Sequence, residues 1–210
     1  NKDYSSVIAA LPDEVDAIYV ALGGADAVNF LTQYEQAGGD LPLIGGSITV
    51  DQTVLGSKGR TREFVIGTPS AGPLSDTWDD PRWQAFVATY KEMFPDGFPS
   101  PSLFAHAYYI NTKAALLALD EVGGDVSDGG AKMREVLAAL EFETPTGMVK
   151  LDERRQAIGS IFLTEVVEGP DGNLLNKTIK VTENVNQTLG VPYEKFLEYG
   201  AVSRENPACE

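Results

Sequence analysis

Two short apolar runs, each closed by glycine and separated by a helical pattern, constrain the fold of this chain most. Residues 15–22 (Val-Asp-Ala-Ile-Tyr-Val-Ala-Leu) run into Gly23 and Gly24, as expected of a buried parallel strand that ends in a turn. Residues 25–37 follow with helical spacing, and residues 41–45 form the second run. With a further helix predicted over residues 4–11, this order indicates an α/β fold with a parallel sheet flanked by helices.

The pattern becomes helical after a break rich in proline and glycine at residues 68–73. A strand is predicted just before the break, over residues 63–67, and helices are predicted after it, over residues 80–94, 103–122 and 131–140. The first of these helices carries a broad apolar stripe that consists of Trp83, Phe86, Val87, Tyr90 and Phe94.

Strands dominate again after a second break at residues 143–147. They are predicted over residues 148–151 and 157–167, with a turn at 169–172 and a further strand or edge at 177–181. The chain therefore changes from α/β to helical to β, with a joint at each break.

The charge of the chain argues against two classes of partner. With 16 basic and 31 acidic residues its net charge is −15, which repels nucleic acid and anionic membrane surfaces. No apolar run reaches the roughly 20 residues that span a bilayer. The first residues also lack the apolar stretch of a signal peptide, so we expect any secretion signal to lie upstream or to have been removed.

The sequence offers little for catalysis, metals or cofactors. His106 is the single histidine and Cys209 the single cysteine, so a zinc site of four such ligands cannot form. The turn at residues 22–27 lacks the glycine spacing of a dinucleotide site and the lysine of a phosphate loop. We therefore expect a protein that is not an enzyme and that carries no metal or cofactor.

The turn after the first strand is a candidate ligand site. Gly23, Gly24, Ala25 and Asp26 lead from that strand into a helix, whose first backbone N–H groups and positive dipole end can hold a carboxylate. Ligands of open parallel sheets bind at this edge. Alternatively, the glycines only permit a tight turn and Asp26 only caps the helix.

The loop after the second strand lies at the same edge of the predicted sheet. Ser47 and Thr49 can donate and accept hydrogen bonds there, and Asp51 could balance an ammonium group. For Ser47 a ligand contact and a plain loop position remain equal alternatives. For Asp51 we favour an ordinary cap before a short helical turn.

Aromatic side chains gather at the start of the helix predicted over residues 103–122. Phe104, His106 and Tyr108 share one side in an extended lead-in, whereas in a helix Phe104 and Tyr108 share a face without His106. Either geometry can build an aromatic wall of a ligand site. The alternative is that Phe104 packs in the core and His106 is a satisfied surface histidine, and for Tyr109 we expect core packing.

Three segments in this order resemble one family, the periplasmic solute-binding proteins of ABC transporters that include the Leu/Ile/Val-binding proteins. They are residues 3–11 (Asp-Tyr-Ser-Ser-Val-Ile-Ala-Ala-Leu), 105–112 (Ala-His-Ala-Tyr-Tyr-Ile-Asn-Thr) and 145–152 (Pro-Thr-Gly-Met-Val-Lys-Leu-Asp). The resemblance implies part of a two-lobed type I periplasmic binding protein fold. It places residues 1–66 in lobe two, 67–147 in lobe one, and 148–210 in the return to lobe two and a C-terminal tail.

The resemblance covers only the C-terminal half of such a protein. The helical middle, residues 67–147, then lacks much of the sheet on which it would pack. We expect it to bind a missing N-terminal half or a second copy of the chain. Cys209 is either a free terminal thiol or pairs with a cysteine outside this sequence.

The resemblance implies a periplasmic or extracellular protein that binds a small molecule between two lobes and delivers it to an ABC transporter permease. Amino-acid-binding members carry an acidic residue near the position of Ser47, where this chain has Gly46 and Ser47. The expected ligand is therefore a small hydrophobic carboxylate, aromatic or like a branched-chain amino acid, and Asp26 could still receive an amine. A ligand-sensing domain of a signalling receptor and an α/β enzyme with its catalytic residues elsewhere are the alternatives.

Overall fold

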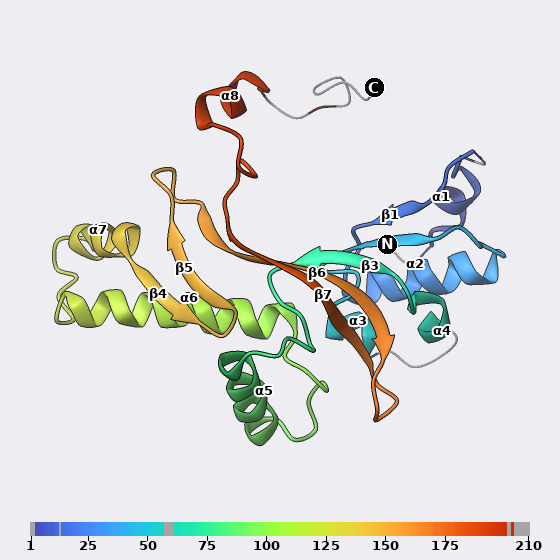
Figure 1. Cartoon of the computed structure of the whole chain (residues 1–210), viewed down its shortest axis with the longest axis horizontal. Helices are drawn as coiled ribbons and strands as arrows, with labels where there is room; N and C mark the ends of the chain where they lie inside the picture. The colour runs from blue at the N-terminus through green and yellow to red at the C-terminus, as the bar shows by residue number, and fades with distance from the viewer. Residues whose placement is uncertain (1–2, 13, 57–60, 201–202, 204–210) are drawn as a thin grey trace.

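The computed structural model describes residues 3–12, 14–56, 61–200 and 203, and it has a mixed α/β architecture (Figure 1). The first part alternates helices and strands: α1 (Ser5–Ala9), β1 (Ile18–Val20), α2 (Gly24–Gln36), β2 (Leu43–Gly46), α3 (Gln52–Leu55), α4 (Thr61–Val65) and β3 (Pro69–Gly72). Three helices follow: α5 (Pro81–Met93), α6 (Leu103–Glu121) and α7 (Ala131–Ala139). The last part contains β4 (Glu141–Thr144), β5 (Gly147–Leu151), β6 (Ala157–Glu168), β7 (Leu174–Val185) and α8 (Tyr193–Glu198).

The strands form one sheet in the order β1-β2-β3-β6-β5-β4, and β7 pairs with β6. The pairs β1·β2 and β2·β3 are parallel, as the α/β pattern predicts, whereas the pairs that involve β4 to β7 are antiparallel. The long hairpin of β6 and β7 crosses the middle of the molecule, between β1–β3 with α1–α4 on one side and α5–α7 with β4 and β5 on the other (Figure 1). The predicted α/β fold class is confirmed.

The main core lies between the first helices and the parallel strands. An aromatic row joins α1, α2 and α4, because Tyr4 meets Phe30 edge-on at 5.7 Å, Phe30 stacks on Tyr34 at 5.8 Å, and Tyr34 meets Phe64 at 5.6 Å. Val166 of β6 is also part of this core. Burial of this apolar surface supplies most of the driving force for folding of the first part.

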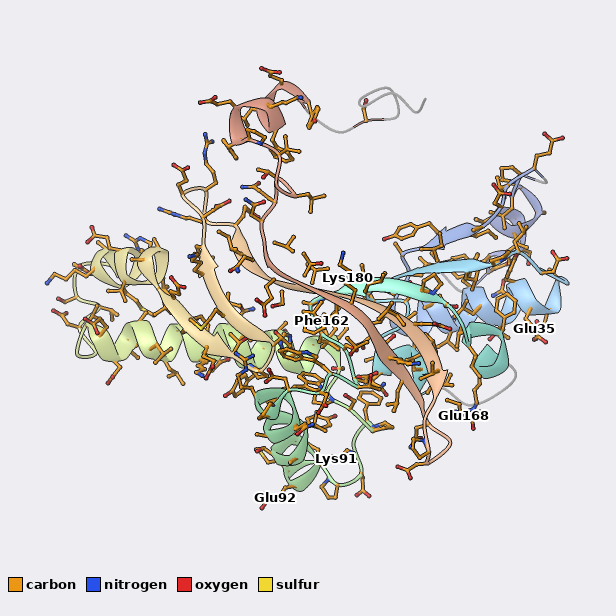
Figure 2. The ribbon with its side chains drawn as sticks, viewed as in Figure 1. Glu35, Lys91, Glu92, Phe162, Glu168 and Lys180 are labelled. Carbon is orange, nitrogen blue, oxygen red and sulfur yellow. The ribbon has the colours of Figure 1, made fainter. Side chains whose placement is uncertain are left out.

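A second packing centre lies where the long hairpin meets the helical part. Phe162 of β6 is fully buried near the middle of the molecule (Figure 2), and Trp78 packs against it edge-on at 5.0 Å. Trp83 of α5 is also buried, and its indole N–H donates to the carbonyl of Asp76 at 3.2 Å. The segment between β3 and α5, which contains Asp76 and Trp78, therefore contacts both the β6–β7 hairpin and helix α5.

The strand predicted over residues 63–67 is wrong. Phe64 and Val65 belong to α4 and pack against the core, and the strand is β3, inside the predicted break. A short apolar run fits a buried strand and a helical turn equally well, so periodicity cannot separate them. Pro69 stands at the first residue of β3, where a sheet tolerates the missing N–H group.

Candidate functional site

The carboxyl ends of β1, β2 and β3 lie at one edge of the sheet because the three strands are parallel. Val20 pairs with Gly45, and Gly46 pairs with Ala71, so the loops that follow the strands start side by side. The first loop leads into α2, the second into α3 and the third toward α5. This edge is where ligands bind in open parallel sheets, and it carries the predicted residues Gly23 to Asp26 and Ser47.

Gly23 and Gly24 shape the turn into α2. A Cβ atom on Gly23 would lie 2.4 Å from Cγ1 of Ile48, so the close approach of the second loop requires glycine there. Gly24 has a φ of 52°, a left-handed conformation that favours glycine. Gly23, the N-cap residue of the 13-residue helix α2, has no side chain that could cap the helix. Its positive end is therefore formed by backbone groups of Gly24 and Ala25.

Asp26 has a protein partner. Burial raises the pKa of Tyr4, and a hydrogen bond with the Asp26 carboxylate raises that pKa further. Asp26 therefore links the first turn of α2 to α1. In the predicted group of residues 23–26, the backbone amides are better placed to receive a ligand than this side chain.

Ser47 lies between the ends of β2 and β3. A Cβ atom on Gly72 would come within 2.7 Å of Cβ of Ser47, so glycine at 72 makes room for this serine. Thr49 is buried, and its hydroxyl lies 2.7 Å from the carbonyl oxygen of Val20 and 2.8 Å from that of Leu22. Thr49 therefore ties the second loop to the end of β1, and Ser47 remains the candidate ligand contact of this loop.

Asp51 acts as a cap, as the sequence indicates, and it does so for two helices. Its Oδ2 accepts from the backbone N–H of Thr53 at 3.1 Å and from the Thr53 hydroxyl at 2.7 Å, at the start of α3. Its Oδ1 accepts from the backbone N–H of Leu103 at 2.5 Å, at the start of α6. One buried carboxylate thus holds the aromatic end of α6 beside the loop that carries Ser47.

The aromatic residues at the start of α6 divide between its two faces. The helix begins at Leu103, so the extended lead-in is wrong, and Phe104 and Tyr108 share an exposed face. His106 is 3% exposed and faces inward, so a surface histidine is also wrong. Tyr109, for which core packing was expected, is exposed as well, although its ring contacts Phe86 at 4.9 Å. Phe104 and Tyr108 are therefore the accessible residues of the predicted wall.

His106 has a structural environment that the sequence pattern did not indicate. Its Nε2 lies 3.0 Å from the Thr146 hydroxyl, and the rings of Trp83 and Phe86 lie 6.1 and 6.3 Å from its own. Burial lowers the pKa of His106 to about 4, so the ring is neutral at pH 7. The histidine thus joins α6 to the turn between β4 and β5.

Two open grooves, which the sequence did not predict as sites, lie on the helical part. One holds about 560 Å³ between α5, α6 and the β4–β5 turn, and it includes Phe86, Tyr90, Met93, Phe94 and Pro145. The other holds about 970 Å³ along α6 and includes Tyr108, Leu116 and Leu117. Both are mainly apolar, as expected of helices that lack a sheet to pack against.

Among the described residues, no group of three or more His, Cys, Asp or Glu side chains is arranged to hold a metal ion. In the same part of the chain, no helix is both long and apolar enough to span a bilayer. Cys209 lies outside the described residues.

The chain belongs to the periplasmic binding protein family, because the model of that family matches residues 1–172. This membership confirms the resemblance that the three sequence segments indicate. A search of curated proteins finds no match.

Three solved structures show how far the similarity extends. An ABC transporter substrate-binding protein from Sphaerobacter thermophilus is 27% identical with a TM-score of 0.74, and the match covers 88% of this chain and 50% of that one. A solute-binding protein of an ABC transporter from Rhodopseudomonas palustris BisB5, in complex with 3,4-dihydroxybenzoic acid, is 23% identical with a TM-score of 0.74, covering 87% and 49%. A leucine-binding protein from Thermotoga maritima is 19% identical with a TM-score of 0.66, also covering 87% and 49%. The chain thus spans about half the length of these structures.

Proposed function

We propose that this chain forms part of the solute-binding component of an ABC importer, and that it binds a small hydrophobic carboxylate at the carboxyl edge of β1–β3. The observation that carries the proposal is the double cap at Asp51, which brings the start of α6 to the loop after β2. The polar side of the site consists of the backbone amides of Gly24 and Ala25 with Ser47. The apolar side consists of Phe104 and Tyr108.

The ligand class follows from the charges at this edge. Backbone amides at the start of a helix attract an anion, whereas an α-amino group needs an acidic partner. Gly46 and Ser47 offer none, and the Asp26 carboxylate is hydrogen-bonded with Tyr4. The chemistry therefore favours an aromatic or aliphatic acid without an amine over a branched-chain amino acid. The relative from R. palustris BisB5 holds such an acid, 3,4-dihydroxybenzoic acid.

The proposal includes the organisation of the whole protein. Residues 1–66 and the return after 147 would form lobe two, and residues 67–147 would form part of lobe one. The grooves on α5 and α6 would be covered by the remainder of lobe one, in a protein about twice as long as this chain. Such a protein would work in the periplasm or outside the cell, would pass its ligand to a membrane permease, and would not be an enzyme.

Isothermal titration calorimetry on the intact protein tests the ligand class. Benzoate is expected to bind, isoleucine to bind more weakly, and benzyl alcohol, which lacks the carboxylate, to show no heat of binding. Failure of both benzoate and isoleucine to bind would contradict the proposed class, and tighter binding of isoleucine would show that an amine is recognised.

Variants of the aromatic face locate the site. Phe104→Ala and Tyr108→Ala should each weaken benzoate binding about tenfold, because each removes apolar contact area from the ligand. Leu189→Ala is the matched control, since Leu189 is also an exposed apolar side chain but lies before α8. Equal affinities for all three variants would place the ligand elsewhere.

A further inference from the structure

A small polar cavity lies beside the loop after β2, whose residues Ser47 and Asp51 form part of its wall. Its volume is about 20 Å³, which is enough for one water molecule or one small ion. The wall is formed by α3, the segment after β3, the start of α6, and strands β6 and β7. Its polar side chains are Ser47, Asp51, Gln52, Ser70, Asp76, Thr164 and Asn176.

Three oxygen atoms around this cavity have no hydrogen-bond partner among the described residues: Oε1 of Gln52, Oδ1 of Asn176 and Oγ of Ser70. The Asp76 carboxylate also faces the cavity, and the Ser100 hydroxyl is the neighbour that hydrogen-bonds with it from outside the cavity wall. Gln52, Ser70 and Asn176 are only 2%, 4% and 5% exposed, so bulk water does not satisfy them. Buried polar atoms without partners are rare in folded proteins. Three around a single cavity, beside a carboxylate, therefore point to a bound species that contacts all of them.

Hydrogen bonds of the amide nitrogens fix the orientation of the Gln52 and Asn176 side chains, and their amide oxygens have no partner among the described residues. Nε2 of Gln52 donates to Oδ2 of Asp76 at 2.8 Å and faces the carbonyl of Leu174 at 3.3 Å. Nδ2 of Asn176 donates to the carbonyl of Val50 at 2.7 Å. Turning either amide over would place two oxygens against each other. Both side chains thus present an acceptor, and the missing partner must be a donor or a cation.

The charges favour a cation. Of the described residues that line the cavity, Asp51 and Asp76 are the titratable ones, and none is a lysine or an arginine. Asp51 is already stabilised by hydrogen bonds at two helix starts. Asp76 accepts from Gln52 and from the backbone N–H of Asn176, both at Oδ2, and it is hydrogen-bonded with the Ser100 hydroxyl. None of these donors is charged, and among the described residues no ion pair with Asp76 is found. Burial raises the pKa of Asp76, and the neighbouring Asp51 carboxylate raises it as well.

We propose that this cavity is a binding site for one small monovalent cation of the size of sodium. Asp76, Gln52, Asn176 and Ser70 would supply its oxygen ligands, the donor type that hard cations prefer. Asp51 is held by two helix starts, so Asp76 is the carboxylate of the wall whose negative charge a single positive charge would balance. The ion would connect α3, the segment after β3 and β7 in a cavity that Ser47 also lines. This site does not depend on the identity of the solute.

Thermal unfolding of the intact protein in sodium chloride and in choline chloride at equal ionic strength tests the site. Sodium that binds only the folded state should raise Tm by roughly 2–4 °C, in a manner that saturates with concentration. The Asp76→Asn variant should lose this difference. Asp79→Asn is the matched control, because Asp79 lies in the same segment but is exposed and accepts a hydrogen bond from Gln84. Equal Tm values in the two salts would overturn the proposal.

A second measurement keeps the proposal testable if Asp76→Asn does not fold. Crystals of the intact protein soaked in thallium(I), a heavier monovalent cation, should show an anomalous peak between Asp76 and Asn176. A water molecule alone at that position would overturn the proposal. So would a Tm that responds to pH but not to sodium, because Asp76 would then be neutralised by a proton.

Discussion

Asp51 and Leu103 are 52 positions apart in the sequence, yet Oδ1 of Asp51 lies 2.5 Å from the backbone nitrogen of Leu103. The same side chain caps α3 through Thr53. The first turns of α3 and α6 are therefore both capped by the carboxylate of Asp51. This contact is the direct link between the parallel sheet and the aromatic end of α6.

Replacing Asp51 by Asn should destabilise the protein more than loss of an ordinary helix cap. We expect the free energy of unfolding to fall by about 2–3 kcal/mol, because two helix starts lose a charged acceptor in a buried position. Asp128→Asn, at the exposed start of α7, should cost about 1 kcal/mol or less. Urea unfolding of both variants checks this, and equal losses would contradict the double-cap interpretation.

His106 should make stability depend on pH in a defined window. Its pKa is lowered by burial from 6.5 to about 4 in the folded state, so between these values the unfolded chain binds more protons. The contribution is fully present above pH 6.5, falls as the pH drops toward 4, and amounts to about 3 kcal/mol in total. His106→Gln, which can keep the contact with Thr146, should show a shallower loss of stability over this range in urea unfolding. Parallel pH profiles for the two proteins would contradict this prediction.

Gly23→Ala should reduce stability through one specific contact. The new methyl group would collide with Ile48, and the second loop would have to move. We expect a loss of about 1–3 kcal/mol, and a partial recovery when Ile48→Ala is added, since the double variant removes the collision. Gly38→Ala is the control: its φ of 78° strains alanine, but no atom lies within 4 Å, so Ile48→Ala should not rescue it. Thermal unfolding of the wild type, the three single variants and the two double variants tests this.

The apolar grooves on α5 and α6 predict the behaviour of the 210-residue chain expressed alone. It should bind the hydrophobic dye ANS and elute from size-exclusion columns as an associated species, because Phe94 and Leu116 expose apolar surface. The double variant Phe94→Lys/Leu116→Lys should reduce both effects. Leu189→Lys, far from the grooves in the sequence, should not. A stable, cooperatively folding monomer would contradict the expectation that these helices need a partner.

Long periodic segments made most of the fold predictable. The helices over residues 24–36, 81–93 and 103–121 follow from regular apolar spacing and from glycine or proline at their ends. The strand β3 could not be predicted, because Pro69, Ser70, Ala71 and Gly72 carry no strand propensity. Its place in the sheet depends on pairing with both β2 and β6, which is tertiary information.

The candidate site was predictable only at the level of its loops. The glycines after the first two strands indicated the edge of the sheet. The spacing of Phe104 and Tyr108 placed both on one face of a helix, but an extended segment with His106 on the same side was an equal alternative. Nothing local indicated that His106 would be buried by Trp83 and Phe86, since these residues meet through tertiary packing. The same holds for Asp76, whose contacts with Gln52 and Asn176 join segments 24 and 100 positions apart.

The strand β6 has a mechanical consequence for any motion of the molecule. Its first residues, Ala157 and Ile158, pair with β5, and residues 162–165 pair with β3. The register with β7 shifts at two places, between Gly159 and Ile161 and between Leu163 and Thr164, and the first shift lies in the interval that separates these two pairings. A β-bulge concentrates twist at one point of a ladder. If the helical part rotated against the parallel sheet, we therefore expect β6 to twist most near residues 159–161. The hydrogen bonds between β6 and β7 would oppose this twist and restore the original arrangement.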